Sequence, residues 1–300
     1  SGLSVSSLSK AFPEKYRGHF LGTHFFNPPY NMPLCELIPS PDTDADVLRE
    51  VKAYCEKVLR RTTVVTTDTP AFLANRIGFE FIGAAVNYAA KYQDSGGIDY
   101  IDAIVGPFTG RNMPPLVTAN FVGLDVCREI FDNLYRNTDD FAHRSFWTPD
   151  YIKKLIRDDC LGKKTGAGLY KTVSYGESVR VKFVYDIGQG GYREVVPYKF
   201  PFAEAVIAFL QVGDYQKAVD TLLRNESQEA VLCRKLMLTY ALYSVYISTR
   251  VGGDVHAADD AMADGFNWIP PLAFIDWVGA ECFVQLCEKN GIGAKLPDRE

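Results

Sequence analysis

Two short apolar runs separated by a bend decide the fold of this chain: Gly22-Thr23-His24-Phe25-Phe26-Asn27-Pro28-Pro29 and Leu34-Cys35-Glu36-Leu37-Ile38. The second run lacks the alternation of polar and apolar residues, which is typical of a strand that is buried on both faces. Prolines and an asparagine lie between the runs, and these turn formers could bring the runs side by side. We therefore expect His24 and Glu36 to lie close together.

Glu36 is the residue of this pair that most needs a partner. A buried polar group without a hydrogen bond costs roughly 2 to 7 kcal/mol, and an isolated charge costs far more. His24 could be that partner, because a carboxylate on one ring nitrogen fixes the tautomer and makes the other nitrogen a better base. Spacing alone favours a structural histidine beside a core glutamate, and an acid/base pair is the alternative.

The same segment resembles the catalytic motif of the 3-hydroxyacyl-CoA dehydrogenases of fatty-acid β-oxidation. In that family a His-Phe-Phe-Asn-Pro run is followed, twelve residues after the histidine, by a glutamate in an apolar strand. Both the residues and the spacing match here. The resemblance implies that His24 takes the proton from the 3-hydroxyl of the substrate while a hydride passes to NAD, and that Glu36 orients the histidine.

The resemblance also implies two residues that position the substrate oxygen. A Ser-rich loop precedes the catalytic histidine in the family, and Ser1-Gly2-Leu3-Ser4-Val5 fits this loop with Ser1 as the matching serine. Ser6 is a second choice, because it requires a deletion before His24. Asn75-Arg76 lies where the family has an Asn-Arg pair near the base. The alternatives are a solvated terminal serine and an asparagine that bonds to a neighbouring loop.

The first half of the chain divides near Asp68. Residues 44–60 have an amphipathic helical pattern, and residues 61–67 form a β-branched strand pattern. Asp68-Thr69-Pro70 then indicates a cap and a proline in the first helical turn, so we expect one helix from there to about Tyr92. Residues 1–67 are thus predicted to be the C-terminal part of an NAD-binding α/β domain.

By resemblance, residues 68–172 are the helical C-terminal domain of the dehydrogenases. The segment Gly162-Lys163-Lys164-Thr165-Gly166 matches the start of the run that ends this domain. Its two lysines could face a CoA phosphate, and a solvated basic turn is the alternative. Residues 173–200 alternate as strands around a glycine turn, which predicts a connecting hairpin.

Residues 201–300 are predicted to be a second, degenerate helical copy, with helices over residues 202–211, 214–224, 227–250 and 271–289. Gly96-Gly97 recurs as Gly252-Gly253, and Pro114-Pro115-Leu116 recurs as Pro270-Pro271-Leu272, both at an offset of 156. The same offset aligns Val231 with Asn75, so the second copy lacks the amide side chain at this position. The predicted fold class is therefore mainly α with a partial α/β layer: the trailing part of a Rossmann-type domain followed by two tandem helical domains, which we expect to pack on each other.

A glycine-rich turn that opens a helix after a strand would mark the binding of the NAD pyrophosphate. The densest glycine cluster, Gly188-Gln189-Gly190-Gly191, lies between strand-like runs and predicts a hairpin turn instead. The residues that bind NAD therefore cannot be named from this sequence. We expect the chain to be a piece of a long multifunctional dehydrogenase that uses NAD only as the full-length protein.

Composition and charge exclude several other classes of protein. A net charge of -5 and a pI near 5.5 argue against a nucleic-acid surface or an anionic membrane as the main partner. No apolar run is long enough to span a bilayer. The seven cysteines and four histidines show no metal-type spacing, and apolar neighbours suit the cysteines to buried thiols in a reducing cytoplasm.

Two classes of function remain. The first is an enzyme piece that acts on 3-hydroxyacyl-CoA, with His24, Glu36, Ser1 and Asn75 in the roles given above. The second is a non-catalytic helical module for assembly or for covering the substrate, in which the His-Glu pair is an inherited part of the core. Homo-oligomer formation is compatible with either class.

Overall fold

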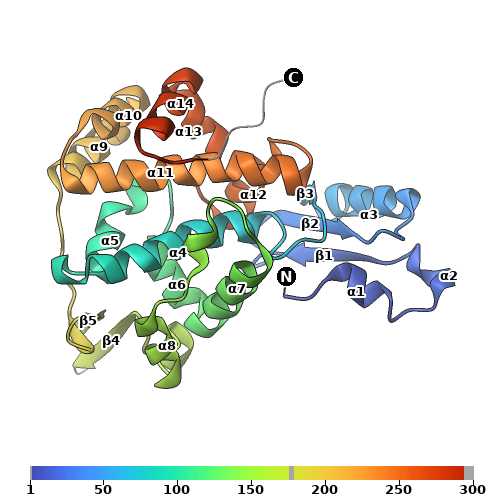
Figure 1. Ribbon diagram of the computed structural model, residues 1–300, viewed down its shortest axis with the longest axis horizontal. Coiled ribbons are helices and arrows are strands. Elements are labelled where there is room, and N and C mark those ends of the chain that lie inside the picture. Colours follow the sequence, from blue (N-terminus) through green and yellow to red (C-terminus); the bar gives the residue numbers. More distant parts are fainter. Residues whose placement is uncertain (1, 176–178, 294–300) are drawn as a thin grey trace. The chain divides into compact units, whose positions relative to one another are not determined.

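The computed structural model describes residues 2–175 and 179–293 (Figure 1). Its contacts divide the chain into two compact units. The first unit holds residues 2–78, 240–276 and 293, and the second holds residues 79–239 and 277–292. This division follows spatial contact, whereas the predicted boundaries at 67, 172 and 200 follow sequence order, and those boundaries stay a prediction.

The first unit is built on a three-stranded sheet of order β1-β2-β3. Strand β1 (Leu21–Phe25) is antiparallel to β2 (Leu34–Pro39), and β3 (Thr62–Val65) is parallel to β2. Because a parallel pair needs a crossover, α3 (Ala45–Lys57) connects β2 to β3. Two short helices, α1 (Val5–Ser9) and α2 (Glu14–Arg17), precede β1.

Strand β2 is the core of this sheet, as its unbroken apolar pattern predicts. Its residues from Leu34 to Ile38 are at most 1% exposed. Cys35 and Leu37 face α3, where Cys55 packs against them. Ile38 faces the other side and packs against Val5 and Phe72. Since side chains alternate along a strand, Glu36 shares the face of Ile38 and not that of the α3 layer.

Helix α4 (Ala74–Lys91) corrects one prediction. The expected helix begins directly after Asp68, but the observed helix begins at Ala74. Ala71 and Phe72 have φ values of 63° and 56°, which lie in the left-handed region. A right-handed helix therefore cannot extend through these two residues. Pro70 therefore lies in a turn, and Asp68 does not cap α4.

The remainder of the first unit comes from the C-terminal third of the chain. It contains the end of α11 (Gln228–Ile247), a π-helical turn at Ser248–Gly252, α12 (Ala257–Phe266) and the start of α13 (Pro271–Val278). Helix α12 packs on β2 with Gly265 against Leu34, where an added Cβ would lie 2.6 Å from Leu34 Cδ2. A larger residue at position 265 would therefore have to displace the side chain of Leu34.

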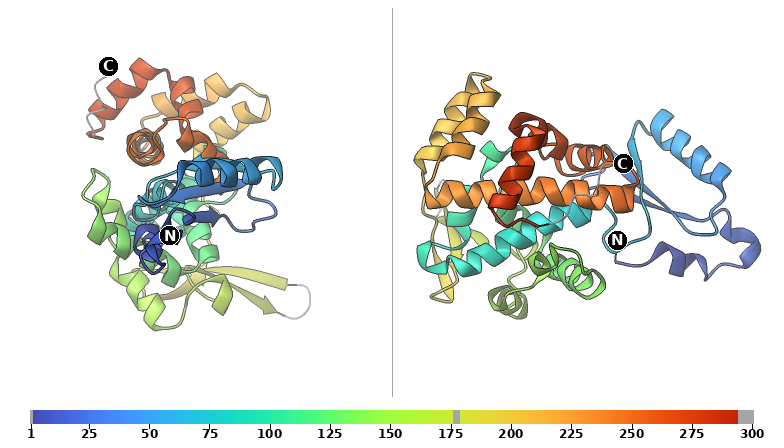
Figure 2. Two further views of the ribbon diagram at one scale, coloured as in Figure 1. Left: turned by 90° about the vertical axis from the view of Figure 1, so that its right-hand side faces the viewer. Right: turned by 45° about the horizontal axis from the view of Figure 1, so that its top comes forward.

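The second unit is mainly helical. Its helices, besides the rest of α4 and α11, are α5 (Ile98–Ile104), α6 (Pro115–Val122), α7 (Leu124–Asn137), α8 (Asp150–Arg157), α9 (Pro201–Gln211), α10 (Tyr215–Arg224) and α14 (Ala280–Lys289). Short 3₁₀ turns lie at Gln93–Ser95, Pro107–Thr109, His143–Phe146 and Lys163–Thr165. Helices α9 and α10 lie side by side (Figure 2).

A second antiparallel sheet of order β4-β5-β6 also belongs to this unit. Strands β5 (Val179–Asp186) and β6 (Gly191–Glu194) form the predicted hairpin, with the glycine cluster as its turn. Strand β4 (Tyr170–Tyr175) was not predicted as a strand; it pairs with β5 along its whole length.

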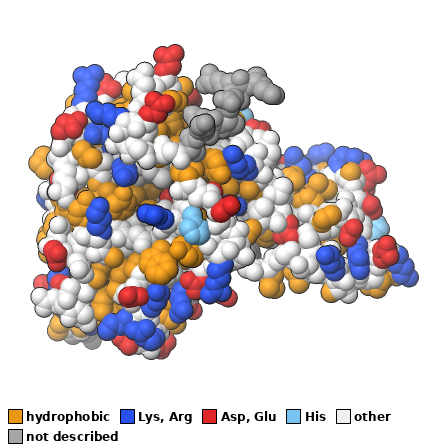
Figure 3. Space-filling view, in the orientation of Figure 1, with side chains coloured by type: hydrophobic (Ala, Val, Ile, Leu, Met, Phe, Trp, Pro, Cys, Tyr) orange, Lys and Arg blue, Asp and Glu red, His pale blue; other side chains and the backbone are white. Residues whose placement is uncertain are grey.

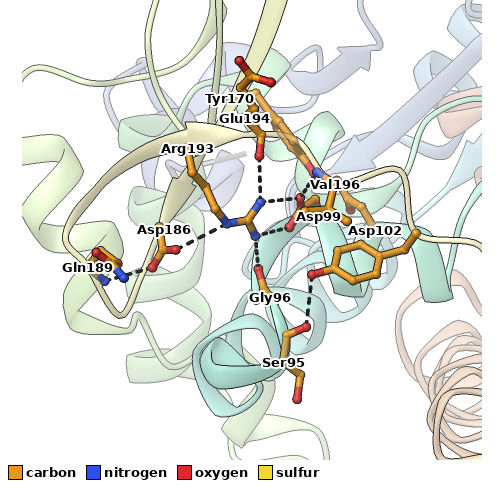
Figure 4. A network of polar contacts seen from close by, with 11 residues as sticks. Ser95, Gly96, Asp99, Asp102, Tyr170, Asp186, Gln189, Arg193, Glu194 and Val196 are labelled. Atoms are coloured by element: carbon orange, nitrogen blue, oxygen red, sulfur yellow. Dashed lines mark hydrogen bonds and ion pairs between the residues drawn. The ribbon is translucent and has the colours of Figure 1, made fainter.

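Arg193 of β6 fastens this second sheet to the first turn of α5 and to the loop before it (Figure 4). Its guanidinium donates to both carboxylate oxygens of Asp99, at 2.7 and 2.8 Å, and to the carbonyl of Gly96 at 2.8 Å. It also forms an ion pair with Asp186 at 3.3 Å. Bidentate arginine–carboxylate contacts are strong and directional, so they fix the position of the hairpin.

Several elements have matching bounds at the offset of 156. Helices α6 and α13 correspond along their whole lengths, α4 and α11 end at corresponding residues, and α7 and α14 begin at corresponding residues. An aspartate also accepts from the first turn of each of α6 and α13, although the two aspartates are 157 residues apart and do not match at this offset: Asp102 accepts the N–H of Leu116, and Asp259 accepts that of Leu272, both at 2.8 Å. These observations support a duplication. The division of the chain into two tandem helical domains stays a prediction.

Two other helical predictions need correction. The helix expected over residues 271–289 is interrupted at Gly279, whose φ of 84° separates α13 from α14. Helix α12 was not predicted at all.

The segment Gln228–Gly252 is long and apolar enough to cross a membrane, but 72% of its most apolar window is buried within the structure. Basic and acidic side chains are interspersed over the face in Figure 3.

Candidate active site

His24 and Glu36 are directly opposite each other on β1 and β2. The Nδ1 atom of His24 lies 2.7 Å from Oε2 of Glu36. The carboxylate is fully buried, whereas the imidazole is 22% exposed. The hairpin therefore brings the two side chains together, as the spacing of the two apolar runs predicts, and the imidazole stays partly exposed.

The second oxygen of Glu36 binds the start of α4. Oε1 accepts the backbone N–H groups of Leu73 at 3.0 Å and Ala74 at 2.8 Å. The first N–H groups of a helix have no partner within the helix, and the helix dipole favours a negative charge at that end. Glu36 thus serves as a remote cap for α4.

The left-handed residues before α4 make this contact possible. Ala71 and Phe72 turn the chain so that two successive N–H groups point at one oxygen. Left-handed backbone costs a residue with a Cβ atom about 1 to 2 kcal/mol. Such strain persists only where surrounding contacts impose it, and it is often found at functional sites.

Aromatic rings surround the imidazole on its other sides. The centroid of the Phe26 ring lies 4.6 Å from that of His24, and the centroid of Phe72 lies 5.5 Å away, both in edge-on arrangements. These contacts, together with the bond to Glu36, leave the ring little freedom to rotate. A carboxylate beside Nδ1 favours the tautomer in which Nδ1 carries the proton and Nε2 has the free lone pair.

Asn75 is the second residue of α4 and directly follows Ala74, whose N–H binds Glu36. Its position is therefore fixed relative to the His24–Glu36 pair by the same helix start. The side chain is partly exposed. Sequence reasoning placed Asn75 on an apolar stripe near a helix start, and the helix does begin beside it.

Ser1 lies outside the described residues, so its predicted role stays a prediction. Ser6, the second choice, lies in α1, and its backbone N–H donates to Asp68 at 2.7 Å. Asp68 also accepts the N–H of Val5 at 3.0 Å and the hydroxyl of Ser4 at 2.7 Å. Asp68 therefore adds to the local N-cap of α1, in which the Ser4 hydroxyl accepts the N–H of Ser7 at 3.1 Å. Although it is distant in sequence, Asp68 holds the serine-rich segment against the end of β3.

Sequence reasoning missed Asp68 in this role and the capping by Glu36. Both contacts join residues more than thirty positions apart, so no local sequence pattern predicts them. The one available signal was the predicted burial of Glu36, which requires more donors than one histidine can supply.

The glycine turn does not resemble a phosphate cradle. In the described part of the chain, Gly188–Gly191 connect two antiparallel strands and do not open a helix. The described residues thus fit the part of a nucleotide-binding domain that carries the base, and we derive no contact to the nucleotide from them.

Two family models match the sequence in succession. One is described as "3-hydroxyacyl-CoA dehydrogenase, NAD binding domain" and matches residues 1–69. The other is described as "3-hydroxyacyl-CoA dehydrogenase, C-terminal domain" and matches residues 72–172. Together these ranges cover more than half of the chain.

Curated proteins that resemble the chain carry related names. A "Probable 3-hydroxyacyl-CoA dehydrogenase" of Bacillus subtilis is 30% identical over 301 residues, which is 99% of this chain and 36% of that protein. A "Putative fatty acid oxidation complex trifunctional enzyme" of Rickettsia felis is 25% identical over 89% of this chain and 35% of its own length. The chain spans about a third of the length of these two relatives.

Among solved structures, a 3-hydroxybutyryl-CoA dehydrogenase of Escherichia coli has a TM-score of 0.65 at 16% identity. The match covers 98% of this chain and 71% of that one, and at this identity it supports the fold alone. The family matches assign the sheet layer to the NAD-binding domain of that family and the helical part that follows to its C-terminal domain. The chain belongs to the 3-hydroxyacyl-CoA dehydrogenase family.

Proposed function

We propose that the full-length protein oxidises (3S)-3-hydroxyacyl-CoA to 3-ketoacyl-CoA in fatty-acid oxidation, with His24 as the general base. The observation that carries this proposal is the 2.7 Å contact between His24 Nδ1 and the buried carboxylate of Glu36. This contact leaves Nε2 as the ring nitrogen that can accept a proton from a substrate.

In the proposed step, Nε2 of His24 takes the proton of the 3-hydroxyl group as the C–O bond becomes a carbonyl. NAD, when bound, accepts the hydride from the same carbon. The imidazolium that forms would be stabilised by Glu36, whose other oxygen accepts two N–H groups at the start of α4. In the reverse direction the imidazolium returns its proton to the carbonyl oxygen.

Asn75 and Ser1 are proposed to position the substrate oxygen. Asn75 is favoured by its place beside Ala74 at the same helix start that binds Glu36. Ser1 rests on the family resemblance of the serine-rich segment, which Asp68 holds in place at residues 4 to 6. The second helical copy, with Val231 opposite Asn75, is proposed to be a structural partner without chemistry of its own.

The test is NADH oxidation with acetoacetyl-CoA by the full-length protein and by its His24→Gln variant. His19→Gln is the matched control, because His19 is exposed and lies just before the same strand. We expect His24→Gln to lose activity by about 10² to 10⁴-fold and His19→Gln to keep it. An active parent whose His24→Gln variant is unimpaired would leave the non-catalytic helical module as the better account.

The 300-residue chain alone is proposed to be inactive. We expect it to show no turnover and no measurable NAD binding, because its described glycine turn is a hairpin. Tight NAD binding by this chain would refute that part of the proposal. A cytoplasmic location is also proposed, and it is supported by the seven cysteines, all of which are free thiols.

A further inference from the structure

The second helical copy contributes residues to the first unit, beside the helix start that carries Asn75. Residues 240–276 belong to the same compact unit as residues 2–78. The proposed function gives this copy no chemistry of its own, since Val231 stands in place of the amide. Its contacts with the start of α4 show what it adds to the site.

Arg76 directly follows Asn75, and its side chain meets Tyr243 of α11. The Nε atom of Arg76 donates to the Tyr243 hydroxyl at 3.2 Å. Arg76 is 8% exposed, and Tyr243 is fully buried. A guanidinium keeps its charge at any physiological pH, and a buried charge needs hydrogen-bond acceptors. The Tyr243 hydroxyl therefore helps to hold the arginine in one place.

The start of α4 is thus held at two points. Oε1 of Glu36 accepts two backbone N–H groups there, which fixes where the helix begins. Tyr243 holds the side chain of Arg76, in the first turn of the same helix. Successive side chains of a helix are about 100° apart around its axis. A contact at Arg76 therefore resists rotation of the helix, and such a rotation would redirect the side chain of Asn75.

The same segment of the second copy packs closely against the first turns of α4. An added Cβ atom at Gly252 would lie 3.0 Å from Cδ2 of Leu73, and one at Gly78 would collide with the ring of Phe266. Such packing permits only small movements of the helix. Small movements matter at a reacting centre, because a misplacement of about 1 Å can cost about 10²-fold in rate.

We propose that Tyr243 is a positioning residue for the dehydrogenase reaction and that it acts through Arg76 on Asn75. This inference rests on the proposed function, in which Asn75 positions the substrate oxygen. The residue of the first copy that aligns with Tyr243 at the offset of 156 is Asn87, so only the second copy has the hydroxyl. The second copy, which lacks the amide, thus orients the amide of the first.

The test is steady-state NADH oxidation with acetoacetyl-CoA by the full-length protein and by its Tyr243→Phe variant, which keeps the ring and loses the hydroxyl. We expect kcat to fall by about tenfold and the KM for acetoacetyl-CoA to change by less than about twofold. The reason is that a misplaced amide impairs the chemical step more than it impairs substrate binding.

Tyr240→Phe is the matched control. Tyr240 lies in the same helix and is also fully buried, and its hydroxyl donates to the carbonyl of Ile269 at 2.7 Å. Each variant loses one buried hydrogen bond, so urea denaturation should show similar losses of stability. Only Tyr243→Phe should lower kcat. Equal effects of the two variants on kcat would indicate a structural role alone and would overturn the inference.

A double-mutant cycle tests whether Tyr243 acts through Asn75. In the Asn75→Ala background, Tyr243→Phe should change kcat by less than about twofold, because the group that it positions is absent. A loss as large as in the parent would overturn the inference. If His24→Gln abolishes turnover while Tyr243→Phe keeps the parental kcat, only this inference fails and the proposed function stands. If His24→Gln is as active as the parent, the proposed function itself fails.

Discussion

Glu36 and Ala74 are joined by a hydrogen bond of 2.8 Å that links the sheet of the first unit to the start of α4. The same carboxylate binds His24 through its other oxygen. One buried side chain thus has two duties, orienting the ring and capping the helix. Substitutions that remove one duty and keep the other can separate them.

Glu36→Gln should damage the chemistry far more than the stability. The glutamine oxygen can still accept the N–H groups of Leu73 and Ala74, but its amide nitrogen would donate to Nδ1 of His24. The ring proton would then move to Nε2 and the base would be lost. We expect activity of the full-length protein to fall by about 10² to 10⁴-fold, measured as kcat/KM.

Glu36→Ala should also destabilise the fold. It leaves two buried N–H groups without an acceptor, which costs about 2 to 4 kcal/mol of unfolding free energy. Urea denaturation of the 300-residue chain measures this quantity. If Glu36→Ala and Glu36→Gln had the same unfolding free energy, the hydrogen bonds from Glu36 to the start of α4 would not contribute to stability.

Ala71 is the second position at which the account can be tested. Its φ is 63° and its side chain is 2% exposed. Ala71→Gly removes the strain but loses a buried methyl group and adds freedom to the unfolded chain, so we expect a change within about 1 kcal/mol. Ala71→Val adds a β-branched side chain at a left-handed position and should cost about 2 kcal/mol or more. Denaturation of both variants gives the comparison, and a well-tolerated valine would rule out this backbone conformation.

Asp68 should stabilise the protein in a pH-dependent way. Burial alone would raise its pKa, but hydrogen bonds from the Ser6 backbone and the Ser4 hydroxyl outweigh burial and hold the pKa below its ordinary value. A lowered pKa contributes stability that is present above about pH 4 and is lost as the pH falls through the folded-state pKa. Asp68→Asn should cost about 1 kcal/mol at neutral pH.

The difference between the parent and Asp68→Asn should shrink as the pH falls from 5 towards 3. Denaturation at a series of pH values measures it. A difference that grows on acidification would mean that the carboxylate is not the form that binds α1.

Glu80 should have the opposite pH dependence. Burial raises its pKa to about 7, despite a hydrogen bond of 2.9 Å from the Ser145 hydroxyl. Between the unfolded-state pKa near 4.3 and about 7, the unfolded chain is ionised while the folded chain keeps its proton, so the parent loses stability as the pH rises. Glu80→Gln cannot titrate and should lack this loss. Equal slopes of stability against pH for the two proteins would contradict the raised pKa.

The sequence predicts the central hairpin well because its information is local. The unbroken apolar run around Glu36 indicates a buried strand, and the proline-rich bend brings β1 and β2 into register. The turn at Gly188–Gly191 and the helices α9 and α10 are signalled in the same way by short-range patterns.

The errors arise where distant residues decide the local structure. Pro70 is typical of a first helical turn, yet α4 begins later, because Glu36 supplies the cap from the neighbouring sheet. Asp68 has the pattern of a local cap, but the donors it meets belong to α1. Strand β4 follows a glycine-rich turn and needs β5 as its partner, so its own sequence indicates it only weakly.

The most direct test of the account is the rate of hydride transfer in a single turnover of the full-length protein with NADH and acetoacetyl-CoA. We predict that His24→Gln slows this step by about 10² to 10⁴-fold while the affinity for NADH stays unchanged. Hydride transfer at the parental rate in His24→Gln would contradict the assignment of His24 as the acid/base group.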